Sequence, residues 1–129
     1  MAKISQISVI LENKPGALAK IARLMADSKL NIEGLMIAEA VGEGMVRIIP
    51  DNPTALARIL KKNGYRFVKD TVLAIDLTNK PGALAEAAEM LGAGEINIQY
   101  AYATGMAHSR KVMAILKVSD QAKAVRLLR

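Results

Sequence analysis

A seven-residue segment, Asn-Lys-Pro-Gly-Ala-Leu-Ala, occurs twice in this chain, at residues 13–19 and again at 79–85. Several other identities share the offset that separates Asn13 from Asn79. These are Ala22 with Ala88, Asn31-Ile32 with Asn97-Ile98, Val46 with Val112, and Ile49 with Ile115. A fixed period of this kind is the sequence signature of a repeated structural unit. The chain is therefore predicted to contain two copies of one fold.

Hydrophobic periodicity predicts how each copy begins. Residues 3–11 alternate polar and apolar side chains, as half-buried strands do, and residues 71–77 repeat the pattern. After Pro-Gly, apolar residues recur with helical spacing, and proline is tolerated there because the first N–H groups of a helix lack internal partners. The predicted buried stripes are Leu18, Ile21, Ala22 and Met25 in the first copy, and Leu84, Ala87, Ala88 and Leu91 in the second.

The rest of the first copy completes a known pattern of elements. A glycine-containing turn at 41–44 separates β-favouring runs at 31–40 and 45–49, which predicts a hairpin. A helix follows from Asn52 to Lys62, and Gly64 separates it from a short strand at 65–68. Each copy therefore reads as β-α-β-β-α-β, the ferredoxin-like α+β fold with an antiparallel sheet and helices on one face. The predicted domains are residues 1–70 and 71–129.

The second copy is predicted to lack its last strand. Its second helix, at about residues 120–128, is followed only by Arg129. The strand at 72–77 would then have one unpaired edge, which stable proteins cover by pairing or association. We expect a second chain or the continuous segment 65–77 to cover this edge, and the chain to form a homodimer.

Composition argues against several classes of function. No apolar run approaches the roughly 20 residues that a membrane span needs, so we expect a soluble, cytoplasmic protein with no membrane partner. The chain has no cysteine and a single histidine, His108, which we place in an exposed turn. It has no nucleophile elbow, phosphate-binding loop or dinucleotide fingerprint. We therefore expect no catalytic residues, no metal and no cofactor.

The positive charge raises the alternative of nucleic-acid binding. The formal net charge is +6, but the basic residues are dispersed over positions predicted to face solvent. Aromatic residues make up only 3% of the chain, with Phe67 as its single phenylalanine. Sheets that bind single-stranded nucleic acid use aromatic side chains as stacking platforms. The composition therefore disfavours this class of partner.

The repeated loop has the chemistry of a binding site. Peptide N–H groups near Gly16, Ala17 and Leu18 precede the helical hydrogen bonds, and glycine lets a ligand approach the backbone closely. A carboxylate suits that place, and the Asn13 amide can both donate and accept, which matches a zwitterion. The alternative is that Asn13 and Asn79 organise the helix start while the glycines permit the turn. Both interpretations remain open at this stage.

The arrangement of motifs resembles that of the ACT domain, the amino-acid-binding regulatory module. A strand, N-[KR]-P-G-x-L, a helix, and Asn-Ile 18 residues after the first Asn occur in both copies. The first copy also resembles the opening of the small regulatory subunit of acetolactate synthase, and the second resembles free-standing tandem ACT proteins. The resemblance implies a non-catalytic amino-acid-sensing regulatory protein. The alternative is a regulatory subunit docked on a biosynthetic enzyme.

The resemblance also implies site residues. In that family the ligand lies between the strand-to-helix loop of one unit and the second strand of the other. The implied sets are Asn13, Gly16, Ala17 and Leu18 with Asn97, and Asn79, Gly82, Ala83 and Leu84 with Asn31. Leu11 and Leu77 stand where serine-binding members can carry a histidine, so we expect an amino acid with an apolar side chain. Tyr100 and Tyr102 are interpreted as packing on a sheet face, with ligand contact as the alternative.

Overall fold

The computed structural model describes residues 1–40 and 42–129, which form two compact units. The first, here called the N-unit, is Ser5–Asp70; the second, the C-unit, combines Met1–Ile4 with Thr71–Arg129. The first four residues thus group with the second repeat, although the sequence places them in the first. The reason is that the strands at the boundary are long enough to run from one unit into the other.

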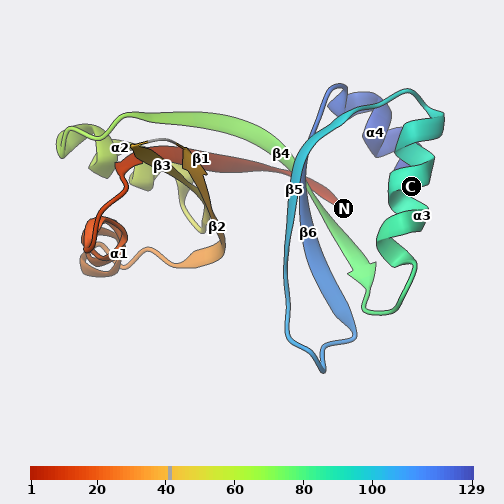
Figure 1. Ribbon diagram of the computed structural model, residues 1–129, viewed down its shortest axis with the longest axis horizontal. Helices are drawn as coiled ribbons and strands as arrows, with labels where there is room; N and C mark the ends of the chain where they lie inside the picture. Colours follow the sequence, from red (N-terminus) through yellow and green to blue (C-terminus); the bar gives the residue numbers. More distant parts are fainter. Residues whose placement is uncertain (41) are drawn as a thin grey trace. The chain divides into compact units, whose positions relative to one another are not determined.

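The N-unit has the predicted ferredoxin-like order of elements. These are β1 (Ala2–Glu12), α1 (Ala17–Asp27), β2 (Ile32–Ala40), β3 (Glu43–Pro50), α2 (Pro53–Lys62) and the start of β4 (Phe67–Thr78). The strands lie in the order β2-β3-β1-β4, and β3 pairs antiparallel with both β1 and β2 (Figure 1). Of the predicted turn at 41–44, residue 41 lies outside the described residues.

The C-unit repeats this arrangement. After the second part of β4 come α3 (Ala83–Ala93), β5 (Ile98–Thr104), β6 (Lys111–Val118) and α4 (Gln121–Leu128). The strand order is β1-β4-β6-β5, and β6 pairs antiparallel with β4 and β5. Helices α3 and α4 pack against each other beside these strands (Figure 1). His108 is exposed in the connection between β5 and β6, as predicted.

The beginning of β1 takes the place of the missing fourth strand in the C-unit. β1 borders β4 in the sheet, and Met1–Ile4 belong to the C-unit. Val72 and Leu73 are accordingly 0% exposed, and Ile75 is 6% exposed. The expectation that this edge must be covered by a second chain or by residues 65–77 is therefore wrong. The segments predicted as strands at 65–68 and 71–77 contribute to one strand, β4, and β1 is its neighbour.

The β5–β6 hairpin is longer than the β2–β3 hairpin. Residues after it therefore no longer correspond at the offset that separates Asn13 from Asn79. Ile7 faces Ile48 in the N-unit, whereas Leu73, the repeat counterpart of Ile7, faces Leu116. The offset of the repeated motif would instead place Ala114 opposite Leu73, and Leu116 stands two positions beyond it. The second hairpin is therefore longer by two residues. Beyond the hairpins the identities of Val46 with Val112 and of Ile49 with Ile115 do not mark equivalent positions.

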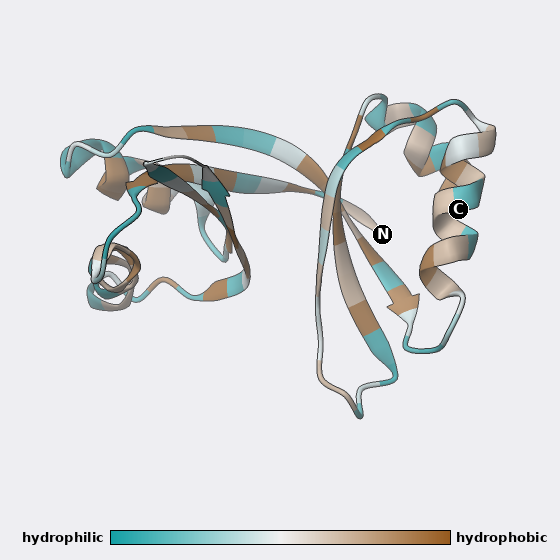
Figure 2. Cartoon of the chain, in the orientation of Figure 1, coloured by the Kyte–Doolittle hydropathy of each residue, from teal (hydrophilic) through white to brown (hydrophobic). Residues whose placement is uncertain are grey.

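Each unit has its own hydrophobic core between sheet and helices. The N-unit core joins strand residues such as Ile7 and Ile48 to Ile21 and Met25 of α1. The C-unit core is built in the same way around Leu91. Hydrophobic and hydrophilic residues alternate along the strands and helices of both units (Figure 2). One residue of the predicted stripe departs from it, because Leu84 is 54% exposed in the first turn of α3.

Within the described part of the chain, no helix has the length and apolar character that crossing a membrane requires.

Candidate functional site

The repeated loop turns on a glycine immediately before each helix. Gly16 precedes α1 with φ of 85°, and Gly82 precedes α3 with φ of 92°. This left-handed region is strained for residues with a Cβ atom, whereas glycine enters it freely. A Cβ built on either glycine would meet nothing within 4 Å, so the backbone conformation, and not close packing, requires glycine here.

This turn leaves peptide N–H groups available at both helix starts. The Ala17 N–H donates to the Lys14 carbonyl at 3.4 Å, and the first helical bond runs from the Lys20 N–H to Gly16. Among the described residues, the N–H groups of Leu18 and Ala19 have no hydrogen-bond acceptor. In the C-unit the corresponding free groups are those of Leu84 and Ala85. Free N–H groups at a helix start suit an anionic ligand group.

The two loop asparagines use their amides differently. Asn79 donates through Nδ2 to the carbonyl oxygens of Ala107, at 3.3 Å, and Ser109, at 2.9 Å. Asn13 donates through Nδ2 to Oε1 of Glu39 at 3.3 Å. Neither side chain caps its helix. Asn79 thus fastens the connection between β5 and β6, with both amide hydrogens engaged and its carbonyl oxygen left as an acceptor.

Asn31 and Asn97 lie at the other end of each helix. The Asn31 N–H donates to Oδ1 of Asp51 at 3.1 Å, and the Asp51 N–H returns a bond to the Asn31 carbonyl. Asn97 makes the same exchange with Ser119. Within one unit, therefore, the structure does not bring the loop asparagine and the strand asparagine together, because an entire helix separates them. The implied sets combine residues of different units and stay a prediction.

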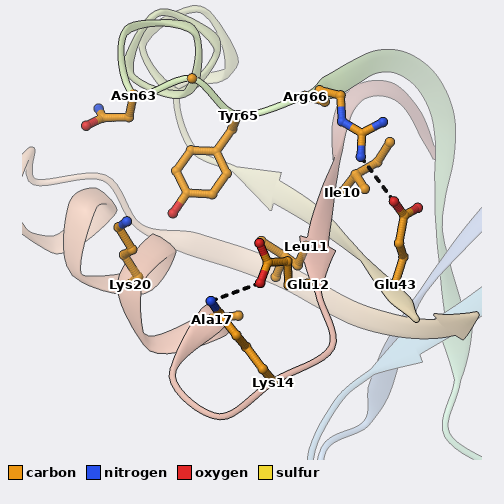
Figure 3. Close-up of a pocket in the computed structure, with 11 residues that line it drawn as sticks. Ile10, Leu11, Glu12, Lys14, Ala17, Lys20, Glu43, Asn63, Tyr65 and Arg66 are labelled. Atoms are coloured by element: carbon orange, nitrogen blue, oxygen red, sulfur yellow. Dashed lines mark hydrogen bonds and ion pairs between the residues drawn. The ribbon is translucent and has the colours of Figure 1, made fainter. Parts of the chain in front are cut away.

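Each unit also has a cleft beside its helix start, which the sequence did not predict. The N-cleft, of about 330 Å³, lies among Ile10–Glu12, the first turns of α1, and Asn63–Arg66 (Figure 3). The C-cleft, of about 460 Å³, lies at the equivalent place in the C-unit, among Ile75–Thr78, α3 and Leu128. Each borders the repeated loop through one alanine of the predicted sites, Ala17 or Ala83.

Ion pairs occupy the N-cleft. Lys14 Nζ lies 2.9 Å from Oε2 of Glu12, and Nη2 of Arg66 lies 3.1 Å from Oε1 of Glu43 (Figure 3). The hydrogen bond and the positive charge of Lys14 lower the pKa of the Glu12 carboxyl. The same contact raises the pKa of Lys14. The Tyr65 ring extends from the connection between α2 and β4 toward α1 in this view.

The equivalent positions of the C-cleft carry different charges. Lys20 of the N-cleft corresponds to Glu86 at the offset of the repeated motif, and Glu43 corresponds to Lys111 once the longer hairpin is counted. Aligning the two repeats on their shared motif exposes the first of these inversions from sequence alone. The second becomes visible only when the longer hairpin is known.

Solved structures of other proteins have a similar architecture. The chain is similar to protein BT0572 from Bacteroides thetaiotaomicron, with a TM-score of 0.92 and 29% identity over 98% of this chain and 86% of that one. The regulatory subunit of aspartate kinase from Thermus thermophilus, in its ligand-free form, has a TM-score of 0.73 and 13% identity, with 96% and 89% coverage. The corresponding subunit from Thermus flavus has a TM-score of 0.69 and 14% identity, with the same coverage.

Among curated proteins, none matches this sequence. The family described as the ACT domain pair matches residues 2–129, nearly the whole chain. The two repeated units, their ferredoxin-like strand order and the glycine turn before each first helix agree with that match. The chain belongs to the ACT domain pair family.

Proposed function

We propose that this chain is a non-catalytic regulatory protein that binds an amino acid at its repeated strand-to-helix loops. The observation that carries the proposal is the pair of free N–H groups at each helix start, Leu18 and Ala19 in one unit and Leu84 and Ala85 in the other. They are preceded by glycines in the same left-handed conformation. Membership of the ACT domain pair family supports this role.

The loop chemistry suits a zwitterion. The free N–H groups receive the ligand carboxylate, helped by the positive end of the helix dipole. The Asn79 carbonyl oxygen accepts from the ligand ammonium, since its N–H groups are already engaged. The family resemblance adds Asn31 and Asn97, at the starts of the second strands, as further candidate ligand contacts.

We also propose that the ligand side chain is apolar. Leu11 is buried and Leu77 is half-buried at the ends of the strands that lead into the two loops. Neither can offer a hydrogen bond to a ligand hydroxyl. A hydroxyl left without a partner in such a site loses affinity relative to a hydrocarbon group of similar size.

A thermal-shift screen of the twenty common amino acids tests the function. A ligand that binds only the folded chain stabilises it by RT ln(1 + [L]/Kd), about 2.7 kcal/mol at 100 times Kd. We expect an apolar amino acid to give the largest rise in Tm. If none of the twenty raises Tm at about 10 mM, the Kd of each lies at or above that concentration by the same relation. The proposal then fails.

Substitution of the two loop asparagines separates binding from folding. Losing a hydrogen bond to a charged ligand group is expected to weaken binding by about 1.5–3 kcal/mol. We therefore expect calorimetry to show weaker binding for Asn13→Ala and Asn79→Ala, and weakest for the double variant. An unchanged affinity in the folded double variant would assign both asparagines a structural role alone.

We propose further that the chain is a homodimer. Because β1 covers the edge of β4, that edge no longer supports a dimer. The support comes from β2, the edge strand at the end of the N-unit strand order. On this strand Leu35 is 38% exposed and Ile37 is 51% exposed. An apolar edge strand favours pairing with another chain. Sedimentation at micromolar concentration should give a dimer that Ile37→Lys converts to a monomer, and a wild-type monomer would contradict this.

The same edge would also suit an enzyme partner. The regulatory subunits of aspartate kinase share the fold, which makes a docked subunit the second candidate function. Isolation of the tagged chain from its own cells distinguishes the two. A large subunit recovered in stoichiometric amount, and lost in Ile37→Lys, favours the docked subunit over a stand-alone sensor.

A further inference from the structure

The first helix of each unit presents a charged face away from its core. Arg23 of α1 stands two residues from both buried core positions of that helix, and Glu89 of α3 does so in the second unit. At about 100° per residue, two residues place a side chain on the opposite side of a helix from its neighbours. Both charged side chains are exposed, as are Lys20 and Glu86 one turn earlier.

The two outward faces have opposite charges. Glu86 and Glu89 occupy the positions of Lys20 and Arg23 at the offset of the repeated motif. Every cationic position of α1 is therefore a glutamate in α3, although the two helices share the spacing of their core residues. The repeat thus keeps one side of the helix and inverts the charge of the other.

These charges have few partners near them. In the part of the chain that the structure describes, Lys20, Glu86 and Glu89 take no part in an ion pair within 4 Å. Arg23 lies 3.9 Å from Asp27, with 75% and 67% of the two side chains exposed. An exposed pair of this kind contributes little to stability, so the Arg23 guanidinium stays available to another carboxylate.

The helix dipoles account for only one of the four charges. Glu86 lies in the first turn of α3, where the positive end of the dipole favours a carboxylate. Lys20 lies in the corresponding turn of α1, where the same end disfavours a cation. Arg23 and Glu89 lie beyond the first turn, where the effect has faded. Residues that break a local rule are expected where a contact outside the local structure compensates.

We propose that the outward face of α1 binds the outward face of α3 in a second copy of this chain. Glu89 of one copy lies opposite Arg23 of the other, and Glu86 adds to the attraction of Lys20. Met90, 50% exposed beside the two glutamates, supplies apolar contact. Pairing α1 with α1, or α3 with α3, would oppose like charges, so the inversion between the repeats selects the α1–α3 contact.

This contact is weak and sensitive to salt. Exposed ion pairs are individually small contributions, and salt screens charges over a Debye length of about 10 Å at about 0.1 M. The contact leaves the edge strand β2 and the free N–H groups of the loops unoccupied. It therefore goes beyond the function proposed above and is tested separately from it.

Sedimentation of a charge-swap series tests the contact. The α1 variant carries Lys20→Glu and Arg23→Glu, the α3 variant carries Glu86→Lys and Glu89→Lys, and the full swap carries all four. The wild-type chain at about 200 µM should gain weight-average mass when salt is lowered from about 300 to about 20 mM. The α1 variant and the α3 variant should each weaken this association about tenfold or more.

The full swap is the matched control. It restores opposite charges and keeps the net charge of the wild type, and it should associate about threefold or more tightly than either half. Recovery is partial because the cations of α2 stay in place. The α1 variant lowers the formal net charge from +6 to +2. If overall repulsion controlled association, this variant would associate more strongly, the reverse of the result expected here.

A spin label locates the contact on the helices. The chain has no cysteine, so Ala93→Cys gives one labelling position on the exposed side of α3. In a mixture with unlabelled 15N chain, the label should broaden the amides around Arg23 at low salt and not at high salt. Broadening of the α3 amides without that of the α1 amides would contradict the pairing.

The outcomes distinguish this contact from the β2 dimer. Ile37→Lys should remove the β2 dimer and leave the salt-dependent step. A wild-type mass that does not change with salt overturns the proposal, and so does a folded full swap that associates no more tightly than both halves. Association that the α1 variant loses and the α3 variant keeps would assign α1 a different acidic surface, which also overturns it.

Discussion

Asn79→Ala is expected to loosen the connection between β5 and β6 more than Asn13→Ala loosens any segment of the N-unit. The Asn79 amide makes two hydrogen bonds, at 3.3 and 2.9 Å, to carbonyl oxygens of Ala107 and Ser109, far along the chain. A hydrogen bond contributes about 0.5–1.5 kcal/mol net, and we assign the lower half of that range to these two because both are exposed to competing water. The two together should contribute about 1–2 kcal/mol, a factor of about 5–30 in the local opening equilibrium.

Amide hydrogen exchange measures this opening locally. The Ser109 N–H, which donates to the Met106 carbonyl at 3.0 Å, reports on the connection. We expect its protection to fall about 5–30-fold in Asn79→Ala, following from the estimate above. Asn13→Ala is the matched control, because it removes one long, exposed bond to Glu39 at 3.3 Å, and such contacts contribute about 0–1 kcal/mol. Unchanged Ser109 protection in Asn79→Ala would refute the assignment of that amide to the hairpin.

Further predictions concern two glycines, the Lys14–Glu12 ion pair and the dispersed positive charge. Gly82→Ala should destabilise the fold by about 1–2 kcal/mol through its left-handed backbone, whereas Gly92→Ala in α3, where a Cβ meets nothing, should stabilise it by about 0.4–1 kcal/mol in urea unfolding. Lys14→Met should raise the pKa of Glu12 toward its ordinary value in a carboxyl 13C titration. Because the folded-state pKa is lowered, the pair contributes to folding stability above the unfolded-state pKa. That contribution disappears as pH falls through the folded-state pKa. Titration with RNA should show no submicromolar binding with a steep salt dependence, the behaviour that a phosphate-backbone binder would display.

Much of the fold could be predicted because its signals are local. Alternation and helical spacing depend on neighbouring residues, and the exact repeat allowed each copy to check the other. The cover over β4 could not be predicted in this way. It depends on Met1–Ile4 belonging to a unit whose other residues begin at Thr71, a long-range arrangement that no local pattern encodes.

The loop glycines illustrate what the motif encodes, and the asparagines illustrate what it does not. Glycine before a helix predicts a special backbone conformation, which Gly16 and Gly82 adopt. The amide partners of Asn79 lie in the connection from β5 to β6, whose conformation the sequence left undetermined. The identical motifs therefore acquire different contacts, because the two hairpins differ in length.

Backbone 15N NMR tests the proposed amino-acid site most directly. The chain is titrated with the amino acid that stabilises it most in the thermal screen. The proposal predicts saturable shifts at the amides of Leu18 and Ala19, of Leu84 and Ala85, or of both pairs, since these N–H groups are free to receive a carboxylate. Saturable binding that leaves all four amides unmoved would contradict it.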